Sequence, residues 1–305
     1  MKINSSHLAK LREQEKLAKA NQAAVEVAVA DYLIEIENEY GFPIKLESLA
    51  GKASPGSIRT AAVWGQPNRR GCHSIAVGRH KPWLLPHRLA QAVAIIEIEC
   101  QADRAGKRRT HCLPGTQFRR LLDRYVPARK DNQGLLKQLF ILSYSLPAEF
   151  AVDAGLQGRF PDLRPAQFVN QHRLEDECAE NLSSLATLDV SPELWLALES
   201  LYAARALFVD RMLGSTIEHF ARFRGSPAAA RAEKMYAAVE AYVSGKPKPG
   251  DHYSLIDRFA GIAGLDGLHA WDKRPLFELN ELIHAQTGYN GTPPASSSPA
   301  GHSLE

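Results

Sequence analysis

Histidines that could bind a metal ion are concentrated in one segment of the chain. His73, His80, His87 and His111 follow one another closely, and imidazole is a common zinc ligand. Two histidines bind one ion from a single helix when they are four residues apart, and no pair in this group has that spacing. The pattern therefore favours solvated or hydrogen-bonded loop histidines over metal ligands.

One predicted helix carries an apolar patch where polar chemistry would be expected. Residues 89–109, LAQAVAIIEIECQADRAGKRR, have helical periodicity, with prolines before the segment and Gly106 near its end. No side chain from Gln91 to Ile95 ionises, whereas the residues that follow are densely charged. Just before this helix, the runs 58–64 and 72–77 flank the turn GQPNRRG, which predicts a β-hairpin.

A hairpin, a proline-marked turn and then a helix is the order found in zincin metallopeptidases, whose helix carries HExxH. Residues 58–168 resemble a bacterial gluzincin-like family of such peptidases in two blocks. The helix keeps the residues around the motif: Leu89, Ala90, Glu97, Glu99, Ala102, Gly106 and Lys107 to Arg109. The second block, SLPAEFAVDAGLQGRFPDLRPAQF, keeps Pro147, Leu156, Phe160, Pro161, Leu163, Arg164, Pro165, Gln167 and Phe168.

The resemblance implies a peptidase site that has lost its chemistry. Gln91 stands at the first zinc-binding histidine, Ala92 at the general base and Ile95 at the second histidine. Asp153 stands at the probable third ligand. Glutamine is a very poor zinc ligand and the other two helix residues are none. We therefore expect these four positions to be vestigial, with no catalytic residue, no cofactor and no metal, and with Ala92 and Ile95 packed as core.

Several alternatives remain open. One is that residues 89–109 form an ordinary buried helix whose resemblance to the zincin helix is accidental. Another is that HExxH was removed by engineering, although a change of histidine to isoleucine is an unusual laboratory choice. A third alternative is an active zinc peptidase that lacks the usual general base. Its unusual ligands would be drawn from His73, His80, His87, His111 and Asp153, with His87 and Asp153 as the candidates singled out. Asp153 is also interpreted as a surface carboxylate on a short helix. Glu97 and Glu99 are expected to pair with Arg104 or nearby bases.

The basic residues point to a different class of function. A group within a short span would attract a phosphate backbone if it formed one stripe: Arg69, Arg70, Lys107, Arg108, Arg109, Arg119, Arg120, Arg124, Arg129 and Lys130. Apolar residues interleave them and no known nucleic-acid module surrounds them. A solvated helix face is therefore favoured, and nucleic acid is a possible but not a favoured partner.

Composition sets broad limits on the protein. The chain has 305 residues, 45% hydrophobic and 23% charged, with a net charge of +3, which is typical of a soluble globular protein. The four cysteines form no CxxC pair, so reduced thiols are expected. The N-terminus has charges where a signal peptide needs an apolar run, which favours the cytoplasm and no membrane contact. Motifs of the types GxSxG, Walker A and GxGxxG are absent.

The fold class predicted is α+β and mainly helical, with a zincin-like hairpin-plus-helix N-terminal half and an all-α C-terminal half. Further helices are expected over 6–40, 118–125, 135–143, 175–185, 192–222, 228–244, 255–263 and 277–285. The domain organisation predicted is a long helix (1–50), a degenerate zincin-like domain (51–170), a helical region (171–245), short helices (246–288) and a disordered tail (289–305).

The functional prediction is a catalytically inactive, peptidase-like binding, scaffold or regulatory module. The hairpin's edge strand is expected to hold an extended peptide, because strand addition uses backbone groups and needs no metal. The predicted binding residues are Ile75 and Val77 on the hairpin and Arg164 in the second block. The expected partner is a protein or a peptide.

Overall fold

A long helix, α1 (Ser5–Tyr40), begins the part of the chain that the structure describes. The structure is a computed structural model that describes residues 5–48, 58–61, 72–78, 80–112, 132–186, 190–214, 218–266 and 269–272. The helix predicted over 6–40 is confirmed, and it ends at Gly41, whose φ of 78° suits glycine best. The helix packs along α2 (Leu85–Arg104) and α5 (Arg164–Leu185), burying side chains such as Val29 and Ile36.

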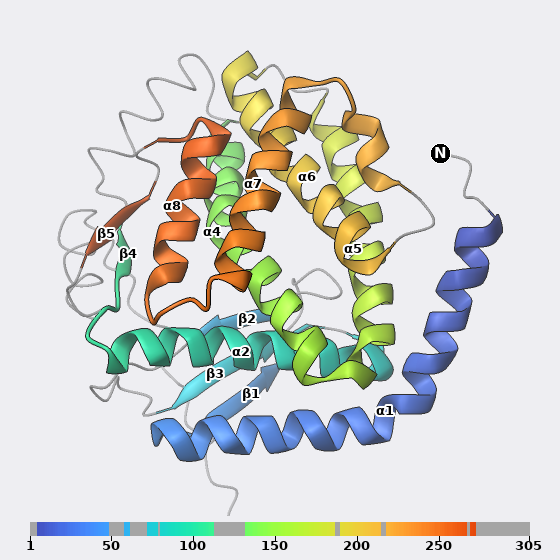
Figure 1. Ribbon diagram of the computed structural model, residues 1–305, viewed down its shortest axis with the longest axis vertical. Helices are drawn as coiled ribbons and strands as arrows, with labels where there is room; N and C mark the ends of the chain where they lie inside the picture. Colours follow the sequence, from blue (N-terminus) through green and yellow to red (C-terminus); the bar gives the residue numbers. More distant parts are fainter. Residues whose placement is uncertain are drawn as a thin grey trace, which may run out of the picture.

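A small mixed sheet lies beside α2 and contains the predicted hairpin (Figure 1). Strand β2 (Ile58–Ala61) pairs antiparallel with β3 (His73–Val77), so the pairing of these two runs is confirmed. Strand β1 (Ile44–Ser48) was not predicted from the sequence, and it pairs in parallel with β3 along its whole length. The strand order is β1-β3-β2, and β3 is therefore the central strand.

Helix α4 (Asn132–Arg159) is longer than the sequence predicted. It continues from the expected segment through Pro147, where a separate short helix was expected to begin. Proline removes one backbone hydrogen bond, and burial of Leu139, Leu146 and Phe150 offsets this cost. Residues 139–159 are long and apolar enough to cross a membrane, but half of that window is buried inside the protein. A helix of this kind is typical of the core of a soluble protein.

The second half of the described chain consists mainly of α6 (Pro192–Leu213), α7 (Pro227–Ser244) and α8 (Asp251–Ala263). Ser191 and Ser226 cap α6 and α7 by accepting backbone N–H hydrogen bonds. Helix α6 ends nine residues earlier than predicted, before Gly214 in the left-handed conformation, and the short 3-10 helix η3 (His219–Phe223) follows. The helices expected over 118–125 and 277–285 and the tail 289–305 lie outside the described residues.

The prediction that the C-terminal half is all-α is wrong in one respect. A short strand, β5 (Ala270–Asp272), pairs antiparallel with β4 (Thr110–Cys112) from the first half. Neither strand has enough residues to show an alternating pattern in the sequence. The coarse fold class is nevertheless confirmed, because the described elements are mainly helical with small sheets.

Hydrophobic clusters cross the domain boundaries expected from the sequence. One cluster joins α1, the sheet, α2 and α4. The largest joins α4 with α6, α7 and α8, and a third joins α1 with α5 and α6. The clusters therefore join described elements on both sides of each expected limit, and the limit after residue 170 falls inside α5, whereas residue 50 itself lies outside the described residues. Helices α2 and α4 lie between the sheet and the C-terminal helices (Figure 1).

Candidate functional site

The positions that the resemblance assigns to zinc chemistry lie in the middle of α2. Gln91 and Ala92 are each 1% exposed, and Ile95 is half-buried against the cluster that includes α1, β3 and α2. The side-chain oxygen of Gln91 accepts a hydrogen bond from the guanidinium of Arg88, which lies one turn earlier. These side chains are packed in the interior, and none of the three supplies an imidazole or a carboxylate.

Asp153 lies on α4 and meets α2 one turn before Gln91. Its carboxylate is fully buried, with Oδ1 3.0 Å from Nε2 of His87, which is also fully buried. Gln171 donates a hydrogen bond to Oδ2 of Asp153, and Gln167 donates one to its backbone carbonyl at 3.0 Å. The interpretation of Asp153 as a surface carboxylate on a short helix is therefore wrong. The structure brings together the two candidate ligands, His87 and Asp153.

Asn170 fixes the directions of the hydrogen bonds around His87. Its Nδ2 donates to the carbonyl oxygen of Leu84 at 3.0 Å and lies 3.0 Å from Nδ1 of His87. Because an amide nitrogen is only a donor, Nδ1 of His87 is the acceptor, and the ring carries its hydrogen on Nε2. The Nε2–H group then donates to Asp153. Both ring nitrogens of His87 are thus occupied, and the ring has no free lone pair for a metal ion.

Buried charges continue from this pair toward α6. Arg205, which is 5% exposed, donates to Oε1 of Gln171 at 2.8 Å. Its guanidinium is 3.8 Å from Glu149 and 3.7 Å from Glu175. Burial raises the pKa of Glu175 to about 7, while Arg205 and Arg222 oppose that rise. Together with His87, Asp153, Asn170 and Gln171, these three residues, Arg205, Glu149 and Glu175, are called the Asp153 network below.

The other predicted ligands are not assembled around a common point. His73 is buried with Nε2 3.7 Å from Sγ of Cys100, and Nδ1 of His80 is 2.9 Å from the carbonyl oxygen of Gly78. The side chain of His111 lies outside the described part of the structure. Among the described residues, no three His, Cys, Asp or Glu side chains are arranged to hold a metal ion. The donor set present does not fit the zinc ion that the resemblance implies.

Two of the three predicted peptide-binding residues cannot act as proposed. Ile75 and Val77 lie on β3, whose two edges are already paired with β1 and β2. Ile75 is also fully buried, whereas Val77 is half-buried. Strand addition at β3 is therefore a wrong prediction, because the hairpin's second strand is central. Arg164 is exposed at the start of α5, with no hydrogen bond or ion pair to another described residue.

Two glutamates on α2 were predicted to pair with Arg104 or nearby bases, and Glu97 does pair with a base, Arg159 of α4. Glu97 accepts hydrogen bonds from Tyr32 and, at 3.2 Å, from Gln101, and its carboxylate is 3.5 Å from Arg159. Glu99 accepts a hydrogen bond from the hydroxyl of Tyr253 at 2.7 Å. Arg104, the predicted partner of both, pairs with Glu39 of α1 at 3.1 Å instead.

Most of the basic group lies outside the described residues, including Arg69, Arg70 and the four arginines and one lysine in 119–130. In the part that is described, Arg108 is 3.9 Å from Asp103, and the guanidinium of Arg109 lies 6.0 Å from the ring centre of Tyr253. These contacts engage two of the three described bases within the fold, so this part of the chain gives the nucleic-acid hypothesis no support.

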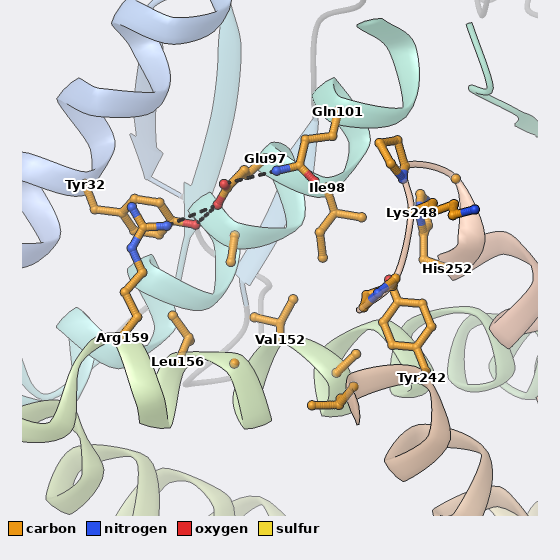
Figure 2. Close-up of a pocket in the computed structure, with 17 residues that line it drawn as sticks. Tyr32, Glu97, Ile98, Gln101, Val152, Leu156, Arg159, Tyr242, Lys248 and His252 are labelled. Carbon is orange, nitrogen blue, oxygen red and sulfur yellow. Dashed lines mark hydrogen bonds and ion pairs between the residues drawn. The ribbon is translucent and has the colours of Figure 1, made fainter. Parts of the chain in front are cut away.

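A pocket of about 320 Å³ was not predicted from the sequence. It lies between α2, α4 and the connection from α7 to α8 (Figure 2). Apolar side chains such as Ile98, Val152 and Leu156 line its middle, and Tyr32, Glu97 and Arg159 lie on one side. His252, Tyr242 and Lys248 lie on the opposite side. One local signal for this region is present in the sequence: the prolines and glycines of SGKPKPGDH predict a linker between two helices.

Comparisons of this chain with family models, curated proteins and solved structures found no match.

Proposed function

We propose that this chain is a peptidase-like protein that no longer cleaves peptide bonds and that acts in the cytoplasm by binding a protein or peptide partner. The observation that carries the proposal is the state of Asp153. Its carboxylate is committed to His87 and Gln171 inside the core. A carboxylate held in this way stabilises the fold and is not available to a metal ion or to a substrate.

The three positions of the HExxH motif support the same conclusion. Zinc-dependent hydrolysis needs an open coordination position and a base that activates the metal-bound water. Ala92 has no ionisable group, and Gln91 and Ile95 supply no imidazole. Burial of these side chains stabilises the helix-to-core contact without any ligand.

The binding surface for an extended partner is moved from β3 to β1 in this proposal. Within the described residues, β1 pairs with β3 and with no other strand, and the N–H of Ile44 at its start donates to Glu37 at 2.6 Å. A partner strand would pair with the backbone groups further along the outer edge of β1. Leu46, in the middle of β1, is 56% exposed. Strand addition would satisfy the backbone groups of that edge and cover this side chain.

Zinc content is the measurement that tests the loss of catalysis. We expect far less than one zinc ion per chain by elemental mass spectrometry, after incubation with zinc and thorough desalting. We also expect no hydrolysis of casein with added zinc. About one zinc ion per chain, or hydrolysis that a chelator abolishes, would overturn the proposal. Asp153→Asn serves as the companion variant, since zinc that is lost with this change would assign the site to His87 and Asp153.

A further inference from the structure

The pocket between α2, α4 and the α7–α8 connection contains a buried imidazole with unused hydrogen-bonding groups. His252 is 3% exposed, yet neither of its ring nitrogens has a hydrogen-bond partner in the structure. Its Nε2 is 3.4 Å from Oε1 of Glu99, outside hydrogen-bond geometry. Buried polar groups without partners cost free energy, so a group of this kind at a pocket wall points to a ligand.

Two further donors lie on the same side of the pocket. The Lys248 side chain is exposed at the rim, and it has no ion pair with another described residue. Tyr242 also lines the pocket, and burial, followed by the negative charge of Asp251, raises the pKa of its hydroxyl to about 12. That hydroxyl therefore remains protonated at neutral pH and can donate a hydrogen bond. Figure 2 shows His252, Tyr242 and Lys248 together across from Glu97.

The start of α8 adds a fourth favourable element for an anion. Gly250 is the N-cap of this 13-residue helix, lines the pocket and provides no side-chain cap. The N-terminal end of a helix carries partial positive charge and backbone N–H groups. Alone this would not define a site, but it coincides with the unpartnered imidazole of His252.

The acceptors of the pocket, by contrast, are already satisfied. Glu97 is the acidic residue of the lining, and Tyr32, Gln101 and Arg159 occupy its carboxylate. Arg159 is in turn 2.7 Å from Glu35. The side chains left to contact a ligand include the cation of Lys248 and the N–H and O–H donors of His252 and Tyr242, which complement a negatively charged head.

The pocket favours a single negative charge. Asp251 accepts a hydrogen bond from the backbone N–H of Lys248 at 2.8 Å, and Glu99 lies beside His252. These two carboxylates, just behind the donors, would repel a dianion more strongly than a monoanion. The middle of the pocket is apolar, and its volume is near the lower end of the range of about 300–1,000 Å³ for small-molecule sites.

We propose that this pocket binds a small amphipathic carboxylic acid, with its carboxylate at His252, Tyr242 and Lys248 and its apolar chain between α2 and α4. The inference goes beyond the binding function proposed above, because it concerns a different part of the molecule and a small ligand in place of a protein or peptide. In the complex, the carboxylate would accept the unused N–H and O–H groups, and the chain would cover Ile98 and Val152.

Titration calorimetry with octanoate tests this inference, with octanamide and octylamine as the neutral and cationic probes of equal chain length. We expect one saturable site for octanoate, at least tenfold weaker binding of octanamide and no binding of octylamine. Lys248→Met and Tyr242→Phe should each weaken octanoate binding about three- to tenfold. Lys234→Met is the control, because this exposed lysine on α7 does not line the pocket.

Two glycines of α4 provide a matched pair that blocks or spares the pocket. Gly155 lines it and Gly158 does not, and an added Cβ meets nothing within 4 Å at either position. Gly155→Leu should reduce octanoate affinity by more than tenfold, whereas Gly158→Leu should change it less than twofold. Equal affinities for octanoate and octanamide would overturn the proposal that the pocket selects an anionic head group. Failure of octanoate to bind, or unchanged octanoate affinity in the Gly155→Leu variant, would overturn the assignment of the ligand to this pocket. The proposed loss of catalysis is tested separately, by the zinc content, and would not be affected by that result.

Discussion

Asp153→Asn is expected to lower the free energy of unfolding by about 1–3 kcal/mol, the range for leaving a buried hydrogen-bond donor without its acceptor. Nε2–H of His87 and the amide of Gln171 both donate to this carboxylate. An asparagine amide presents one acceptor and one NH2 group, so it leaves at least one of these donors facing another donor. The change also removes the negative charge near the buried guanidinium of Arg205.

Urea denaturation of the native protein and the variant at pH 7.5 measures this loss. Asp162→Asn is the matched control, because Asp162 is exposed in the 3-10 helix η2 (Pro161–Leu163), and the same change there should cost less than about 0.5 kcal/mol. A loss below about 1 kcal/mol for Asp153→Asn would mean that the carboxylate is not committed to the network. Asp153 would then again be a candidate ligand.

The start and end of a helix could be predicted from the sequence where local signals alone determine them. The helical periodicity of residues 6–40 and the break at Gly41 and Pro43 predicted α1 to within one residue. Pro147 was expected to separate two helices, but the apolar residues on both sides are buried against other helices, and tertiary packing outweighs the cost of the proline.

Strand positions depended on contacts that no local pattern contains. The pairing of β2 with β3 followed from the turn between two β-branched runs. The sequence did not indicate that β1 joins the other edge of β3, because a parallel pair is formed by segments distant in the chain. That missing strand is the reason why Ile75 and Val77 were assigned to an edge and in fact belong to the central strand.

The candidate site was accessible from the sequence only in part. His87 and Asp153 were both named as candidates, and the structure places their side chains 3.0 Å apart. Asn170 and Gln171, which occupy them, have no signature of their own, since amides matter here only through their position on α5. The pocket at His252 combines residues of five helices and a loop, so its unpartnered imidazole is visible only once the chain is folded.

Acidification is expected to destabilise the protein through its buried histidines. Burial lowers the pKa of His172 to about 3 and that of His219 and His269 to about 4. Below the ordinary pKa of 6.5, these histidines become protonated in the unfolded chain but stay neutral in the native protein. The free energy of unfolding therefore decreases as the pH falls below 6.5. Each histidine that stays neutral in the native protein at pH 5 lowers the free energy of unfolding by about 2 kcal/mol relative to pH 7.5.

The geometry around His172 explains why it resists protonation. Its Nδ1 is 2.8 Å from Nε2 of His219, and the ring of His7 is 4.9 Å from it between centres. Lys10 and Arg222 add positive charge near this group, whereas Asp176 lies near His7. A proton on either member of the hydrogen-bonded pair would therefore be placed in a buried site beside other imidazoles and cations.

Glu175 is expected to have the opposite effect on stability, because its protonation should stabilise the native protein as the pH falls. Its pKa of about 7 exceeds the ordinary value of 4.5, so the native state gains a proton before the unfolded chain does and is stabilised as the pH falls from 7 toward 4.5. The three histidines together should lower the free energy of unfolding by about 6 kcal/mol between pH 7.5 and 5, and Glu175 should raise it by about 3 kcal/mol. We therefore expect urea denaturation to show a net decrease of roughly 3 kcal/mol between these two pH values.

Glu175→Gln removes the opposing group and should make the loss on acidification larger by about 2–3 kcal/mol. The double variant His172→Asn with His219→Gln should make it smaller by about 4 kcal/mol, whatever the effect of either change on stability at pH 7.5. The control is Ser244→Ala, at an exposed residue that has no ionisable side chain and lies outside this cluster, and it should leave the slope unchanged. If Glu175→Gln left the pH profile unchanged between pH 7.5 and 5, Arg205 and Arg222 would outweigh burial and keep Glu175 ionised in the native protein, as it is in the unfolded chain.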